Sequence, residues 1–156
     1  SDVLAFETDP LEDDTEVTGE VMIKLWVSST ASDTDFTVKL IDVYPMSDDY
    51  PEGYHLNLSD TILRARYRNS WTDPEMMTPG EPAEVSITLW PTSSVFKKGH
   101  RIRLDISSSN FPRFDVNPNT GEPVGRHTHM LKADNTIHTG ADHPSRIVLP
   151  IIPAVE

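Results

Sequence analysis

The sequence predicts an all-β fold, a jelly-roll β-sandwich. About eight or nine short segments alternate apolar and polar residues, which is typical of strands that bury one face. No segment of ten or more residues has the period of an amphipathic helix, and turn-rich connections separate the segments without a βαβ rhythm. Long crossing connections favour a jelly roll over a simple meander.

The first expected strands cover residues 3–6, 20–28 and 36–43. The second has the clearest alternation, and its apolar face consists of Val21, Ile23, Leu25 and Val27. The acidic run 12–16 is expected to be a solvated loop, since it lacks the glycine-containing tight turn of a calcium loop.

Residues 45–60 carry many turn signals and are predicted to be a long loop, and residues 62–67 to be a strand or a brief helical turn. Arg64, Arg66 and Arg68 stand at alternate positions in an otherwise acidic chain. On a strand they would share one face, which favours pairing with carboxylates in an internal ion-pair network.

Further strands are expected at residues 83–89, 101–107, 135–138 and 146–149. The strand at 101–107 is followed by a loop, residues 108–121, that holds two Phe and one Arg among Asn, Pro and Gly. These residues exceed what a simple connection needs, so the sequence indicates that a core strand carries a functional loop to one end of the domain.

The formal net charge of −12 and the pI near 4.7 disfavour nucleic acid and membranes as partners, because both need a positive field. No apolar run is long enough to cross a bilayer. The absence of Cys excludes disulfides and is compatible with a reducing compartment, so a cytoplasmic location is expected. The length of 156 residues fits a single domain. The sequence leaves open whether the protein forms a homo-oligomer.

The sequence contains neither the nucleophile motif of α/β-hydrolases nor a recognisable serine-histidine triad. The G-x-S-x-G elbow of α/β-hydrolases is missing, since the spacing between Gly121 and Gly125 places Pro123 at the nucleophile position. Ser107, Ser108 and Ser109 lie near His100 in sequence, but such adjacency does not make a triad. No catalytic residue is predicted.

Metal and carbohydrate sites are weaker alternatives. His127, His129, His138, Asp142 and His143 fit no closed zinc pattern, and Asp33 with Asp35 would be the candidates for a calcium site. No metal or cofactor is predicted. Carbohydrate binding would need exposed aromatic side chains, whereas Trp26 and Trp90 lie in or beside strands and are expected to be packed.

The order of several short motifs resembles the C-terminal domain of X-prolyl dipeptidyl-peptidases and of cocaine-esterase-type (CocE/NonD) serine hydrolases. The resemblance covers almost the whole chain, and its most specific part is the run 107–114 followed by the Asn-Pro-Asn-Thr-Gly motif at 117–121. The other matching segments are residues 4–6, 9–11, 18–20, 26–29, 33–36, 40–43, 63–68, 99–104, 143–145 and 149–150.

The resemblance implies a galactose-binding-like jelly roll, with residues 1–156 as the single C-terminal domain of a larger serine hydrolase. In that family the Ser-Asp-His triad lies in an α/β-hydrolase domain upstream, so no catalytic residue carries over to this chain. The expected function is therefore non-catalytic: the domain packs on the catalytic domain of the same polypeptide and helps to wall its active-site region. A carbohydrate-binding jelly-roll module is the alternative.

Phe111, Pro112, Arg113 and Phe114 are the candidate interdomain contacts, because Phe and Arg are enriched in interfaces. In the alternative, this loop folds onto its own sandwich, with Asn117 and Asn119 satisfying turn backbone.

Overall fold

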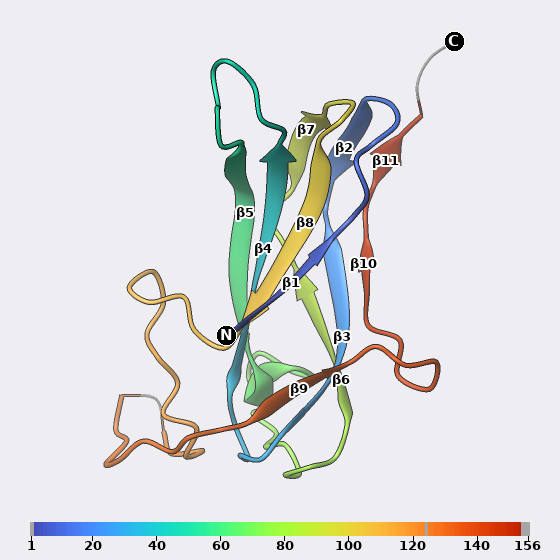
Figure 1. Ribbon diagram of the computed structural model, residues 1–156. Helices are drawn as coiled ribbons and strands as arrows, with labels where there is room; N and C mark the ends of the chain where they lie inside the picture. The colour runs from blue at the N-terminus through green and yellow to red at the C-terminus, as the bar shows by residue number, and fades with distance from the viewer. Residues whose placement is uncertain (1, 124, 154–156) are drawn as a thin grey trace.

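The computed structural model describes residues 2–123 and 125–153, and within them the chain forms eleven strands in two layers (Figure 1). The strands are β1 (Val3–Glu7), β2 (Thr15–Gly19), β3 (Met22–Ser29), β4 (Asp35–Tyr44), β5 (Tyr54–Arg64), β6 (Ala83–Thr88), β7 (Thr92–Phe96), β8 (Arg101–Ser107), β9 (Asn135–His138), β10 (Arg146–Val148) and β11 (Ile151–Ile152). A single 3₁₀ turn, η1 (Ala65–Tyr67), follows β5. The all-β sandwich is confirmed, and the jelly-roll detail stays a prediction.

One layer is an antiparallel sheet in the order β1-β8-β4-β5. The other consists of two short sheets placed end to end, β10-β3-β6 and β11-β2-β7, with β9 also paired to β3. Backbone hydrogen bonds bridge their junction, from Leu89 N to Val21 O (2.9 Å) and from Thr18 N to Pro150 O (3.1 Å). Gly19 makes this junction possible: its φ is +132°, and a Cβ there would lie 3.2 Å from the Pro150 ring.

The core lies between the layers and follows the period-two pattern of the sequence. Val21, Ile23, Leu25 and Val27 are all buried, as their alternation predicted. The alternation of β8 likewise buries Ile102, Leu104 and Ile106. Full burial of each such side chain contributes about 1.5–3 kcal/mol, so these alternating strands supply much of the stability of the sandwich.

Several strands lie where the sequence predicted none. β5 begins at Tyr54, so the predicted 45–60 loop is wrong over its second half; the turn signals end at Gly53, and Tyr54 to Asp60 pair with β4. β2 covers the end of the acidic run, and β7 and β11 were not expected. β2, β7 and β11 are short, and β7 consists mainly of Thr and Ser, so neither a contrast in hydropathy nor length identifies these three strands.

The connections gather at the two ends of the sandwich. The β4–β5 hairpin projects at one end, and the long 108–134 connection lies at the other, beside the β3–β4 turn and η1 (Figure 1). Within the described residues, no helix is long and apolar enough to span a membrane.

Candidate functional site

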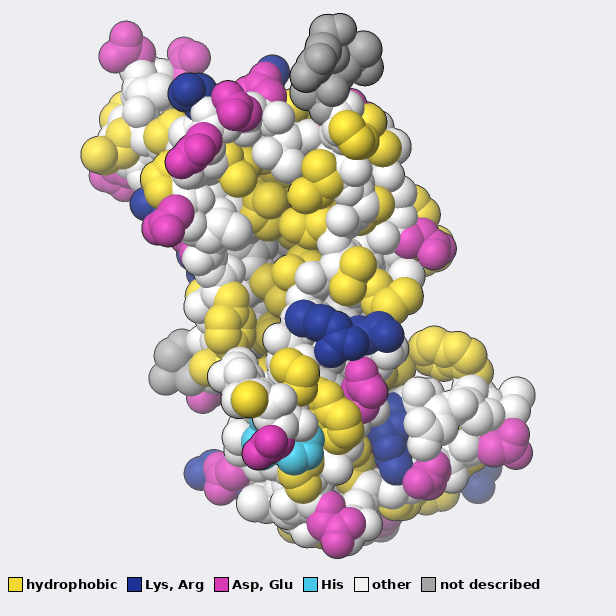
Figure 2. Space-filling view, turned by 90° about the vertical axis from the view of Figure 1, so that its right-hand side faces the viewer, with side chains coloured by type: hydrophobic (Ala, Val, Ile, Leu, Met, Phe, Trp, Pro, Cys, Tyr) yellow, Lys and Arg dark blue, Asp and Glu magenta, His cyan; other side chains and the backbone are white. Residues whose placement is uncertain are grey.

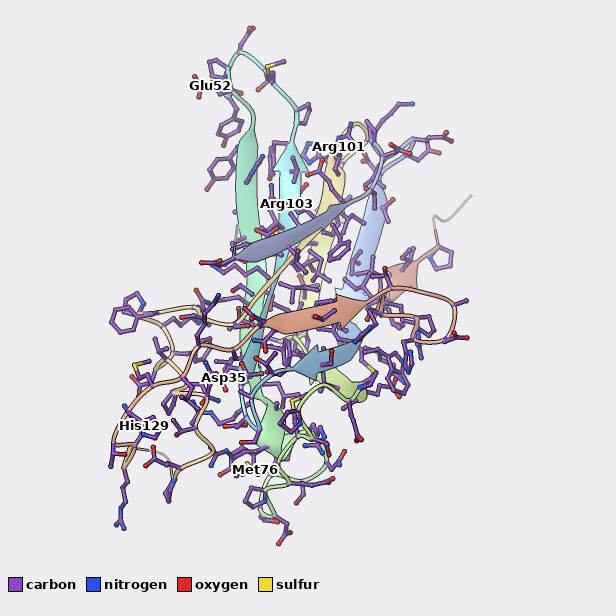
Figure 3. All side chains as sticks on the ribbon, turned by 60° about the horizontal axis from the view of Figure 1, so that its bottom comes forward. Asp35, Glu52, Met76, Arg101, Arg103 and His129 are labelled. Carbon is purple, nitrogen blue, oxygen red and sulfur yellow. The ribbon has the colours of Figure 1, made fainter. Side chains whose placement is uncertain are left out.

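A cluster of ionic and polar side chains, all buried except the partly exposed Arg64, ties the 108–134 connection to the sandwich. We call it the loop clamp: Asp33, Asp35, Arg64, Arg66 and Asn117. Its two carboxylates and two guanidinium groups balance in charge, as burial requires. Figure 3 shows Asp35 at the same end of the molecule as Met76 and His129, opposite the end that carries Glu52 and Arg101.

Each carboxylate in the loop clamp has an arginine partner. Arg66 donates from Nε to Asp33 Oδ2 (2.8 Å), and its backbone N donates to Asp33 Oδ1 (3.0 Å). Arg64 binds Asp35 through two parallel hydrogen bonds of 2.9 and 3.1 Å, and the carboxylate raises the pKa of Arg64 above its usual value. The predicted arginine ion-pair network is confirmed, but Arg66 lies in η1 rather than on a common strand face.

Asn117 joins the loop to this network. Its Nδ2 donates to Asp33 Oδ2 (2.9 Å) and to Asp35 Oδ1 (2.7 Å), so one amide bridges both carboxylates. Arginine and amide donors therefore occupy the two aspartates that the calcium alternative needed, and the adjacent guanidinium charges oppose a cation there.

The chain after Asn117 is also fixed in place. Asn119 adopts a positive φ of 62°, and its N–H donates to Asn117 Oδ1 in an Asx turn. Gly121 has φ +76°, and a Cβ there would lie 3.1 Å from Ser32 Oγ, so glycine permits a close approach to the β3–β4 turn. Arg66 Nη2 then donates to the Glu122 carbonyl (3.1 Å), which holds the far side of the loop.

The predicted contact residues lie on the part of the loop before the clamp. Phe111 is 69% exposed and Pro112 is exposed as well. Arg113 forms an ion pair with Asp60 (3.1 Å) while staying largely exposed, and its guanidinium lies 5.6 Å from the Phe114 ring centre. The loop is therefore divided: its Asn117–Asn119 part folds onto the sandwich, as the alternative expected, while Phe111 and Pro112 face outward.

The serine run does not form a triad with His100. His100 stands just before β8, and its Nδ1 lies 2.8 Å from Oδ1 of buried Asp42, whereas Ser107 ends the same strand. His100 and Ser107 are seven positions apart, which is roughly 23 Å along an extended strand. Burial raises the pKa of Asp42, and the hydrogen bond with His100 offsets part of that rise.

A different Ser–His contact occurs on the other layer. Ser28 Oγ lies 3.0 Å from His138 Nε2, and His143 packs beside both His138 and Trp26. His127 and His129 lie elsewhere, on the exposed loop, and no group of three His, Cys, Asp or Glu among the described residues could hold a metal ion.

The tryptophans differ from expectation in one case. Trp26 is half-buried against His143, in line with packing. The prediction that Trp90 is packed is wrong, because its side chain is 72% exposed: Leu89 fills the inward position and Trp90 takes the outward one. The alternation of Val85, Ile87 and Leu89 as inward residues already indicates that Trp90 points outward.

The chain is similar, over almost its whole length, to part of several larger proteins. The chain is 49% identical over 153 residues to the cocaine esterase of Rhodococcus sp. (strain MB1 Bresler), a match that covers 97% of the chain but 26% of that enzyme. Among solved structures, an α-amino acid ester hydrolase superposes with a TM-score of 0.91 at 36% identity, and an aminopeptidase from a marine sediment Thaumarchaeota archaeon with 0.91 at 35%. Each of these matches covers 97% of the chain and 26% of the structure's chain.

The family match agrees with these relatives and with the absence of a nucleophile elbow. Residues 1–148 match the family described as the X-Pro dipeptidyl-peptidase C-terminal non-catalytic domain. The resemblance given by the motif order is thereby confirmed. The chain belongs to this family of non-catalytic C-terminal domains, found in hydrolases of the CocE/NonD type.

Proposed function

We propose that this chain is the accessory C-terminal β-sandwich of a larger serine hydrolase that cleaves esters, amides or X-Pro peptides. It packs on the catalytic domain of the same polypeptide and helps to wall the active-site region. One observation carries the proposal: the chain spans only 26% of the cocaine esterase and of the α-amino acid ester hydrolase that it matches almost end to end.

The loop around Phe111 has the properties of a docking element. Phe111 presents a large apolar side chain to solvent, while Asn110 and Arg113 bind Asp60 and the loop clamp holds the following residues. A contact surface that is already ordered loses little conformational entropy when its partner arrives. The 111–114 segment is therefore our candidate for contact with the catalytic domain.

The test is the Phe111→Ala change in the full-length enzyme. Loss of an anchoring aromatic side chain should lower the melting temperature of the enzyme or reduce kcat/KM by several-fold. Trp90→Ala is the matched control, since Trp90 is exposed to a similar degree (72% against 69%) and lies outside the loop. Wild-type activity and melting temperature in the Phe111→Ala enzyme would refute contact through this residue.

Carbohydrate binding is the second candidate function, and the exposed indole rings of Trp71 and Trp90 favour it. A glycan array probed with and without calcium tests it. Binding that is lost in Trp71→Ala or Trp90→Ala would support a lectin-like role, and a blank array would oppose it.

A further inference from the structure

The face of β1 that points toward the core is exposed to solvent. Its register with β8 places Leu4 opposite Ile106 and Phe6 opposite Leu104, and both β8 residues belong to the core. Opposed residues of an antiparallel pair point to the same side of the sheet, so Leu4 and Phe6 point toward the sandwich interior. Yet Leu4 is 46% exposed and Phe6 is 43% exposed.

The cause is an open groove between the two layers. Leu4 and Ile106 line a cleft of about 580 Å³ that Ile137 of β9 borders, and Phe6 and Leu104 line a neighbouring cleft of about 280 Å³ on the β10 side. We call the two clefts the β1 groove. Core residues form its floor, and apolar side chains dominate the smaller cleft, whereas residues 107–109 and Asn135 make part of the larger cleft polar. The groove therefore exposes a strip of the hydrophobic core.

Figure 2 looks on the side of the molecule that carries β10 and β11, and it shows apolar side chains along the middle of that face, with basic and acidic side chains among them and further acidic side chains toward the margins. Asp2, Glu7 and Asp134 border the groove, but Glu7 lies 3.5 Å from Arg101 and Asp134 lies 3.4 Å from Lys132. An occupant therefore needs an apolar stripe, and the net charge of −12 on the domain favours one that also carries basic residues.

We propose that the β1 groove receives an apolar segment, bordered by Lys or Arg, from the hydrolase portion of the same polypeptide. This inference rests on the proposed function and identifies a second contact surface, separate from the Phe111 loop. The relatives keep most of their length outside the part that this chain spans, which provides ample chain to cover the groove. A segment of the same polypeptide also has a high effective concentration at the groove.

A second copy of the domain fits the groove less well. Two chains of net charge −12 repel each other. The charge of the domain therefore favours a basic-flanked segment over self-association.

The test uses a photo-reactive benzophenone amino acid placed at Phe6 in the full-length polypeptide. After irradiation, mass spectrometry of the monomer should find crosslinks from position 6 to a peptide outside residues 1–156. Val95 of β7 is the control position because it has the same exposure (43%) but lies away from the groove, and its crosslink yield should be several-fold lower. Equal yields at both positions would overturn the proposal.

A probe at Phe111 separates this proposal from the proposed function. If position 111 reaches the hydrolase portion while position 6 crosslinks only within residues 1–156 or, in an isotope-mixed sample, to a second copy, the groove assignment is wrong and the accessory role stands. If neither position reaches the hydrolase portion, both proposals fail.

Discussion

Arg66 and Asp33 form an almost fully buried ion pair, with Nη2 and Oδ2 2.7 Å apart. The pair is additionally tied by the Arg66 backbone N–H, so the carboxylate fixes both the side chain of Arg66 and the start of η1. Because Asn117 shares the same carboxylate oxygen, one buried aspartate joins the β3–β4 turn, η1 and the 108–134 connection.

Asp33→Ala should strongly destabilise the protein, because it leaves the Arg66 guanidinium buried without its counter-charge. Removing one partner of a buried pair costs about 3–5 kcal/mol in the free energy of unfolding, measurable by urea denaturation. Lys97→Ala is the control, since Lys97 pairs with Asp14 in solvent and its loss should have no measurable effect. Equal losses in the free energy of unfolding for the two substitutions would show that the buried ion pair stabilises the protein no more than the exposed one.

Asn117→Asp should release the 108–121 loop. The substitution keeps the shape but removes both donated hydrogen bonds and adds a third carboxylate beside Asp33 and Asp35, which should cost about 3 kcal/mol. Hydrogen exchange should rise in residues 108–121 and stay slow in β3 and β8. Asn119→Asp loses only an exposed bond to the Leu131 carbonyl and should exchange nearly as wild type. Unchanged protection of the loop in Asn117→Asp would contradict its role in the clamp.

Asp42→Asn should change how stability depends on pH. The pKa of Asp42 is raised from 3.8 chiefly by burial, so between pH 3.8 and the higher folded value the folded protein binds more protons than the unfolded chain. Stability of the wild type therefore falls as pH rises through that interval, whereas an amide does not titrate. The free energy of unfolding of Asp42→Asn minus that of wild type should rise through the interval and then level off. A difference that falls with pH would show that His100 outweighs burial.

The sequence predicted the core strands well and the site only in part. β3 and β8 alternate over seven or eight residues, so their inward faces were readable. Polar strands such as β7 are held by pairing with β2, which depends on tertiary contacts that hydropathy does not record. The alternation of Arg64, Arg66 and Arg68 indicated ion pairs, but the bridging role of Asn117 depends on two aspartates that lie 82 and 84 residues away. The openness of the β1 groove was equally invisible, because Leu4 and Phe6 have the pattern of an ordinary buried face.

The most direct measurement labels the native polypeptide with a serine-reactive fluorophosphonate and detects it with an antibody against these 156 residues. The accessory-domain assignment predicts a labelled band several times heavier than 17.5 kDa, with the adduct on a peptide outside residues 1–156. An adduct on a serine within this chain, or an unlabelled polypeptide of 17.5 kDa, would contradict it.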